Sequence, residues 1–158
     1  MTYTIMYLDD DDTFKKTTRE DISERDKNAE ILLASTISEA KQLLIEHTDI
    51  AFIIVDLWLT KELRAPGEIP RGGYDFVKWV LSEERLSELP ILVVTAYGDN
   101  MLPKLNEKLN EIILEKGRGM QMQIQKRICT VSWTNDYDDW DKAIHRYIDN
   151  ARHKYSNS

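Results

Sequence analysis

The chain has 158 residues, the size of one ordinary domain, since single hydrophobic cores span about 100–200 residues. Hydrophobic residues make up 42% and charged residues 31%, which is typical of a globular protein and excludes a disordered or fibrous chain. The net charge of −7 repels phosphate backbones and anionic lipid, so we expect no nucleic acid and no membrane among its partners.

The sequence carries no recognisable targeting or membrane segment. No apolar run approaches the roughly 18 residues of a membrane span, and the start, MTYTIMYLDDDD, lacks the basic region and cleavage site of a signal peptide. The one cysteine, Cys129, excludes an intrachain disulfide and fits a reducing compartment. We therefore expect a cytoplasmic protein in which residues 1–158 form a single domain with no output domain attached.

Apolar segments typical of buried strands alternate with segments of helical periodicity, which predicts a parallel sheet covered by helices on both faces. The first half predicts three strands, at Thr4–Leu8, Ala29–Ala34 and Ile50–Val55. A weak helix over 13–27 separates the first two strands, and its few apolar positions include Phe14 and Ile22. Thr36 and Glu39 form a capping box that opens the second helix.

Prolines and glycines without an apolar period predict a long loop over 60–73. The elements expected after it are a helix at Tyr74–Leu81, a strand at Ile91–Val94, a helix marked by Leu102, Leu105, Leu109, Ile112 and Ile113, a strand at about Ile128–Trp133, and a last helix with Trp140, Ile144, Tyr147, Ile148 and Ala151 on one face. Five β-units, without a sixth, complete the predicted domain.

Polar residues stand where three of these strands end. Asp9 and Asp10 follow the first strand, Asp56 follows the third, and Thr95 ends the fourth. Because parallel strands present their carboxyl ends at one edge, where ligands of open α/β sheets bind, we expect these side chains to converge. Neighbouring carboxylates repel one another unless a proton or cation intervenes, and Mg²⁺ prefers such oxygen ligands. A carboxylate beside Mg²⁺ can attack phosphorus, and Thr95 can donate a hydrogen bond to a phosphoryl group.

Each acid also has a simpler interpretation. The run Asp9 to Asp12 can be a solvated turn that places negative charge at the start of the next helix. Asp56, taken alone, can be a loop acid or a helix cap. The shared metal site is favoured because it explains both features together.

Four motifs stand in register at the expected strand ends: Leu8-Asp9-Asp10-Asp11, Ile53-Ile54-Val55-Asp56-Leu57-Trp58-Leu59, Gly73-Tyr74-Asp75-Phe76 and Leu89-Pro90-Ile91-Leu92-Val93-Val94-Thr95-Ala96-Tyr97. From Thr4 to about Lys154 the chain thereby resembles the receiver domains of two-component response regulators. The resemblance implies a flavodoxin-like (βα)5 three-layer α/β sandwich with a five-stranded parallel sheet in the order 2-1-3-4-5.

The resemblance also implies roles for particular residues. Asp56 would accept the phosphoryl group, Mg²⁺ would be held by Asp9, Asp10, Asp56 and the main-chain carbonyl of Trp58, and Thr95 would contact the phosphoryl oxygen. The phosphodonor would be a histidine kinase or a phosphotransfer protein. The signal would leave through protein contact on the face formed by residues 100–150, and we expect no enzymatic turnover.

The sequence departs from the family at the end of the fifth strand. Receiver domains carry a lysine there, whereas residues 130–135 read Thr-Val-Ser-Trp-Thr-Asn, and Lys126 and Arg127 lie at the opposite end of the strand. The loop 60–73 and the stretch 100–125 are also longer than usual. An alternative is therefore a pseudo-receiver that binds its partner without phosphorylation.

A further alternative is a haloacid-dehalogenase-type phosphatase. The run Asp9-Asp10-Asp11-Asp12-Thr13 fits the Asp-x-Asp-x-Thr signature of those enzymes, with Asp9 as nucleophile and Asp11 as general acid. That interpretation leaves Asp56 without a role. It predicts turnover of small phosphate esters that is lost in Asp9→Asn, whereas a receiver predicts single-turnover labelling that is lost in Asp56→Asn.

Overall fold

The computed structural model describes residues 1–57, 59, 71–95, 102–115, 127–132 and 137–156. Its elements are, in chain order, β1 (Tyr3–Leu8), α1 (Asp12–Arg25), β2 (Ala29–Ala34), α2 (Ile37–Glu46), β3 (Ile50–Asp56), α3 (Arg71–Ser82), η1 (Glu84–Leu86), β4 (Ile91–Thr95), α4 (Leu102–Glu115), β5 (Ile128–Ser132) and α6 (Tyr137–Ser156). The five strands are parallel in the order β2-β1-β3-β4-β5. This order confirms the predicted α/β sandwich.

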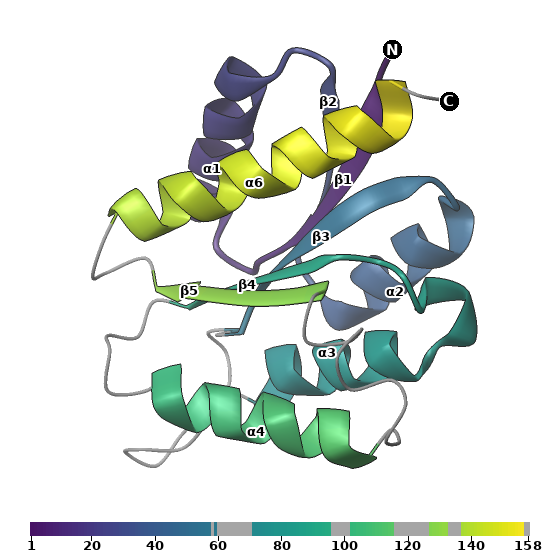
Figure 1. Cartoon of the computed structure of the whole chain (residues 1–158), viewed down its shortest axis with the longest axis vertical. Coiled ribbons are helices and arrows are strands. Elements are labelled where there is room, and N and C mark those ends of the chain that lie inside the picture. The colour runs from purple at the N-terminus through teal and green to yellow at the C-terminus, as the bar shows by residue number, and fades with distance from the viewer. Residues whose placement is uncertain (58, 60–70, 96–101, 116–126, 133–136, 157–158) are drawn as a thin grey trace.

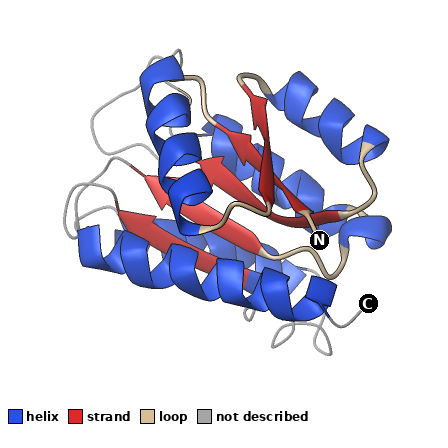
Figure 2. Cartoon of the chain, turned by 90° about the horizontal axis from the view of Figure 1, so that it is seen from above, coloured by secondary structure: helices blue, strands red, loops and turns tan. Residues whose placement is uncertain are grey.

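Helices cover both faces of the sheet, as Figures 1 and 2 show: α1 and α6 lie on one face, and α2, α3 and α4 lie on the other. The central strand β3 is buried along its whole length, which explains its unbroken apolar sequence. Alternate residues of each strand therefore enter two separate cores. Among the described helices, none has the length and the apolar character that crossing a membrane requires.

Helix α1 contacts the sheet through Ile22, an apolar position noted in the sequence, and through two polar residues that the sequence did not single out. Its buried residues are Lys15, Thr18 and Ile22, at the spacing i, i+3 and i+7 that places them on one face. Of the two apolar residues noted in the sequence, Ile22 is buried and Phe14 is 45% exposed. Asp11 is the N-cap of this helix, and its carboxylate accepts a hydrogen bond of 3.0 Å from the main-chain N–H of Phe14.

Helix α2 has the predicted cap. The main-chain N–H of Glu39 donates to the Thr36 hydroxyl oxygen at 3.1 Å. The Glu39 carboxylate in turn accepts from the N–H of Ser35 at 2.9 Å, one residue before the cap. Both donors are thereby satisfied at the start of the helix, as in a capping box.

The loop expected over 60–73 is too long, because α3 begins at Arg71. Gly72 and Gly73 suggested a break in the chain but belong to the first turn of the helix, where glycine is tolerated. Residues 60–70 lie outside the described part of the chain.

The last helix packs on the sheet as its pattern predicts. Trp140, Ile144, Tyr147 and Ile148 are all buried in the core that α6 shares with α1 and the sheet. The Tyr147 hydroxyl donates to the main-chain carbonyl of Ile91 at 2.8 Å and so joins the helix to the start of β4.

Candidate functional site

Three carboxylates meet at the carboxyl edge of the sheet. Oxygens of Asp9, Asp10 and Asp56 all lie within 4.8 Å of one another. The pairing of β1 with β3, which sets Leu8 beside Val55, brings the residues after each strand together. Asp9 is 1% and Asp56 8% exposed, so this cluster is largely shielded from water.

Asp9 is held at both of its carboxylate oxygens. The Tyr7 hydroxyl donates to Oδ2 at 2.5 Å, and the main-chain N–H of Asp11 donates to Oδ1 at 2.9 Å. Burial raises the pKa of Asp9 above its ordinary value of 3.8, and the negative charge of Asp10 adds to this rise. Hydrogen bonds with Tyr7, Asp11 and Asp56 only partly oppose it. The cluster therefore favours a proton or a cation among its oxygens.

Tyr7 connects the cluster to helix α1. Burial raises the pKa of the Tyr7 hydroxyl, followed by the negative charge of Asp9, so this group stays protonated and remains a donor. The Thr18 side chain of α1 hydrogen-bonds to Tyr7 in turn. Sequence reasoning missed both residues, although the two-residue spacing of Tyr7 and Asp9 already placed them on one face of the strand.

Lys15 is a second group that sequence reasoning missed. It is 6% exposed, contacts the Ser35 hydroxyl, and lies 3.1 Å from a carboxylate oxygen of the exposed Asp12. Ser35 follows Ala34, whose carbonyl accepts a hydrogen bond of 3.0 Å from the N–H of Asp9. Lys15 thus holds the end of β2 beside the acidic cluster.

Thr95 ends the strand next to Asp56 and is fully buried. The N–H of Leu57 donates to the carbonyl of Val94 at 3.0 Å, which ties the chain after Asp56 to the end of β4. Strand register sets Thr95 beside Ser132, the position on β5 nearest this edge. The predicted metal ligand Trp58 lies outside the described residues.

Arg127 occupies the opposite end of β5, as the sequence predicts. Its guanidinium donates to the carbonyls of Leu89 at 3.0 Å and Leu86 at 2.6 Å. Both residues precede β4 in the chain. Burial lowers its pKa, an effect that the negative charge of Glu88 only partly offsets. Lys126, which the sequence also placed at this end of the strand, lies outside the described residues.

Gly73 brings helix α3 against the segment that follows Asp56. A Cβ atom at this position would lie 2.5 Å from Cα of Leu57 and 2.8 Å from the carbonyl oxygen of Asp56. These atoms belong to the backbone and cannot rotate away, so only glycine permits this contact. The sequence predicted a glycine turn before the third helix, but Gly73 lies inside its first turn, and the need for glycine there is steric.

The donor set fits a hard divalent cation. The three groups are all carboxylates, and Mg²⁺ takes oxygen ligands while keeping part of its water shell. Asp9, Asp10 and Asp56 would hold the ion, which would offset the mutual repulsion of the three charges.

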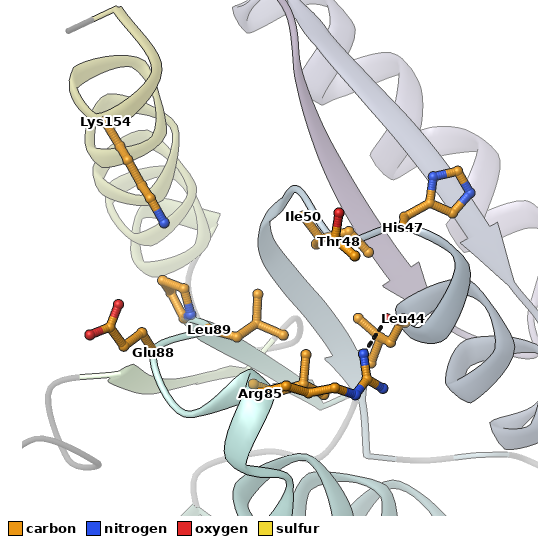
Figure 3. Close-up of a pocket in the computed structure, with 10 residues that line it drawn as sticks. Leu44, His47, Thr48, Ile50, Arg85, Glu88, Leu89 and Lys154 are labelled. Atoms are coloured by element: carbon orange, nitrogen blue, oxygen red, sulfur yellow. Dashed lines mark hydrogen bonds between the residues drawn. The ribbon is translucent and has the colours of Figure 1, made fainter. Parts of the chain in front are cut away.

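Cavities between described residues are also found away from this cluster. Figure 3 shows one of about 320 Å³ at the amino end of β3, lined by side chains that include His47, Ile50, Arg85 and Lys154. Arg85 is engaged there by the carbonyl of Leu44, to which it donates at 2.9 Å. This hydrogen bond joins η1 to α2, which gives Arg85 a structural role. The acidic cluster therefore remains the better candidate for chemistry.

No protein-family model matches the sequence, and no curated protein matches it. Solved structures do match. The signal receiver domain of the DNA binding response regulator merR from Colwellia psychrerythraea 34H superposes with a TM-score of 0.64 and 12% identity, over 93% of this chain and 98% of that one. The chemotaxis protein CheY4 of Vibrio cholerae superposes with a TM-score of 0.63 and 16% identity, over 93% of this chain and 99% of that one. An adenylate cyclase from Rhodopirellula baltica superposes with a TM-score of 0.62 and 18% identity, over 99% of this chain and 95% of that one.

At these identities the likeness establishes the fold. The chain has the fold of response regulator receiver domains, as the resemblance in its motifs predicts. The acidic cluster lies at the edge of this sheet where open α/β proteins bind their ligands.

Proposed function

We propose that this chain is a receiver module of two-component signalling that accepts a phosphoryl group on Asp56 with the help of Mg²⁺. One observation carries the proposal: three carboxylates lie within 4.8 Å of one another at the carboxyl edge of a receiver fold. Two of them, Asp9 and Asp56, are buried, which costs stability unless a cation or a proton compensates. A protein that only binds a partner through its surface gains nothing from burying these carboxylates.

The chemistry is a transfer between two side chains. A carboxylate oxygen of Asp56 attacks the phosphorus of a phosphohistidine on a histidine kinase or phosphotransfer protein. The new P–O bond forms as the P–N bond breaks, and the imidazole nitrogen keeps the electron pair. Mg²⁺ would neutralise charge on the acids and the phosphoryl oxygens. Asp9, Asp10, Asp56 and the main-chain carbonyl of Trp58 would hold the ion, and the Thr95 hydroxyl would donate to a phosphoryl oxygen.

The absence of a lysine beside Thr95 bears on the response to phosphorylation. Strand register sets Ser132 at this position, so the described residues of β5 offer no lysine there to compensate a phosphoryl charge. We propose that Asp56 still accepts the group and that the output surface is the face of α4, β5 and α6 within residues 100–150. The side chains of Glu107, Lys108 and Glu111 on α4 are exposed there. The alternative is a pseudo-receiver that binds its partner constitutively.

The phosphatase alternative is less well supported. It needs Asp11 as a general acid, yet the Asp11 carboxylate caps helix α1 by accepting from the N–H of Phe14. It also gives no role to Asp56, which shares the cluster with Asp9.

The test is labelling with a small phosphodonor. Wild-type protein, Asp56→Asn and Asp12→Asn are incubated with Mg²⁺ and acetyl phosphate and followed by intact mass. In parallel, beryllofluoride, a mimic of the phosphoryl group, is added with Mg²⁺ and followed by amide NMR. Asp12 is the matched control, because it belongs to the same acidic run but its side chain is 95% exposed. We expect an adduct and shifts near Thr95 in wild type and Asp12→Asn, and neither in Asp56→Asn.

Other outcomes contradict the proposal. If no variant gives an adduct or a shift, the chain is a constitutive binding module. If small phosphate esters are turned over repeatedly and Asp9→Asn abolishes this, the protein is a phosphatase.

A further inference from the structure

The buried strand β1 carries two tyrosines that each donate to an aspartate. Tyr7 is fully buried and its hydroxyl donates to Asp9 Oδ2 at 2.5 Å. Tyr3, four residues earlier on the same face, is 2% exposed and donates to Asp26 Oδ2 at 2.7 Å. The two pairs therefore have the same chemistry at opposite ends of one strand.

The surroundings of the two aspartates differ. Arg152 approaches Asp26 Oδ2 to 2.8 Å, so a cation of the chain itself balances that carboxylate. Asp9 instead faces the carboxylates of Asp10 and Asp56. Of the two tyrosines, only Tyr7 acts on a carboxylate of the acidic cluster.

We propose that Tyr7 is a positioning residue for the cation site, holding Asp9 in the orientation in which it shares one cation with Asp10 and Asp56. This inference rests on the proposed function. Tyr7 restrains Oδ2, and the N–H of Asp11 restrains Oδ1 at 2.9 Å, so the carboxylate cannot rotate freely. Each carboxylate oxygen can accept more than one hydrogen bond or ligand, so both restraints leave room for a metal.

Removal of the Tyr7 hydroxyl would act on Asp9 in two ways. Oδ2 would be buried without this donor, and the side chain would lose one of its two restraints. Donors to metal-ligating groups fix the orientation of the ligand, and their loss typically costs about 10–100-fold in metal affinity. The Thr18 side chain, which hydrogen-bonds to Tyr7, would lose this partner as well.

The experiment compares Tyr7→Phe with Tyr3→Phe, which keep the rings and each remove one hydroxyl. Mg²⁺ affinity is measured by calorimetric titration of the unphosphorylated protein, and thermal unfolding is measured without metal. We expect the dissociation constant of Tyr7→Phe to rise about 10–100-fold, and that of Tyr3→Phe to stay within about two-fold of wild type. Both variants should lose stability, because each loses a buried hydrogen bond to a carboxylate.

Three results would overturn the inference. The first is that Tyr7→Phe binds Mg²⁺ with the affinity of wild type. The second is that Tyr3→Phe weakens Mg²⁺ binding as much as Tyr7→Phe does, because that would show general destabilisation. If wild type itself does not bind Mg²⁺, the proposed function fails together with this inference. Should Tyr7→Phe not fold, ring NMR of wild type decides: Mg²⁺ must shift the Tyr7 resonances and leave those of Tyr3 in place.

Discussion

The metal-free protein carries an electrostatic cost at its acidic cluster, and Asp56→Asn should remove part of it. The substitution keeps the shape of the side chain and deletes one negative charge. Two unit charges 4.8 Å apart, the largest separation in the cluster, repel by about 3 kcal/mol at an effective dielectric constant of about 20. Burial and the charge of Asp10 raise the pKa of Asp9, so the repulsion is smaller wherever this carboxyl is protonated. We therefore expect a gain of about 1–3 kcal/mol in the free energy of unfolding without metal.

The assay is thermal or urea unfolding near neutral pH with and without Mg²⁺. For a chain of 158 residues a gain of this size raises Tm by about 2–10 °C. Saturating Mg²⁺ should reverse the order, because a ligand that binds only the folded state stabilises by about 4.1 kcal/mol at about a thousand times its Kd. Wild type should receive this stabilisation, and Asp56→Asn should receive much less.

Asp12→Asn separates this effect from a general reduction of negative charge. Asp12 is 95% exposed and lies 3.1 Å from the Lys15 ammonium, so its loss should leave stability unchanged or slightly lower. The reasoning is refuted if Asp56→Asn is no more stable than wild type without metal. Equal stabilisation of both proteins by Mg²⁺ would likewise refute it.

Three further predictions concern pH and packing. Burial raises the pKa of Asp9, so the stability that its protonated carboxyl contributes is complete below about pH 3.8 and is lost as the pH rises through the raised pKa. Without metal, the urea midpoint should fall over that pH range, and saturating Mg²⁺ should make this decrease smaller. Burial alone would raise the pKa of Asp26, but hydrogen bonds, first among them that from Arg152, lower it. The stability that Asp26 contributes is therefore present above about pH 3.8 and is lost as the pH falls through the lowered pKa. Arg152→Ala should reduce this loss of stability in acid, and an unchanged acid profile of the urea midpoint would contradict the assignment. Gly73→Ala should cost about 1–3 kcal/mol in urea unfolding and shift the amide resonance of Leu57, because the added Cβ would meet backbone atoms at 2.5–2.8 Å; a silent substitution would show that α3 can move away freely.

The amino-acid sequence alone determines the strands and the meeting of the acids. Unbroken apolar runs are local signals, and the second strand occupies Ala29–Ala34 as predicted. Since parallel strands end at a common edge, the positions of Asp9, Asp10 and Asp56 after their strands were sufficient to predict that they converge. The order of the strands came from the resemblance to receiver domains, which rests on the same motifs.

Other features depend on contacts that local sequence does not encode. Lys15 and Thr18 face the sheet while Phe14 faces solvent, because the docking of α1 selects its buried side and a lysine stem can cover apolar surface. Helix α3 starts at Arg71, before the two glycines, and Gly73 in its first turn approaches the backbone of Leu57 closely. Neighbouring elements bury Tyr7 and Asp9, which shields their hydrogen bond from water. The sequence determined which groups reach the edge, and the tertiary structure decided their burial, partners and proton affinity, because these depend on atoms far apart in the chain.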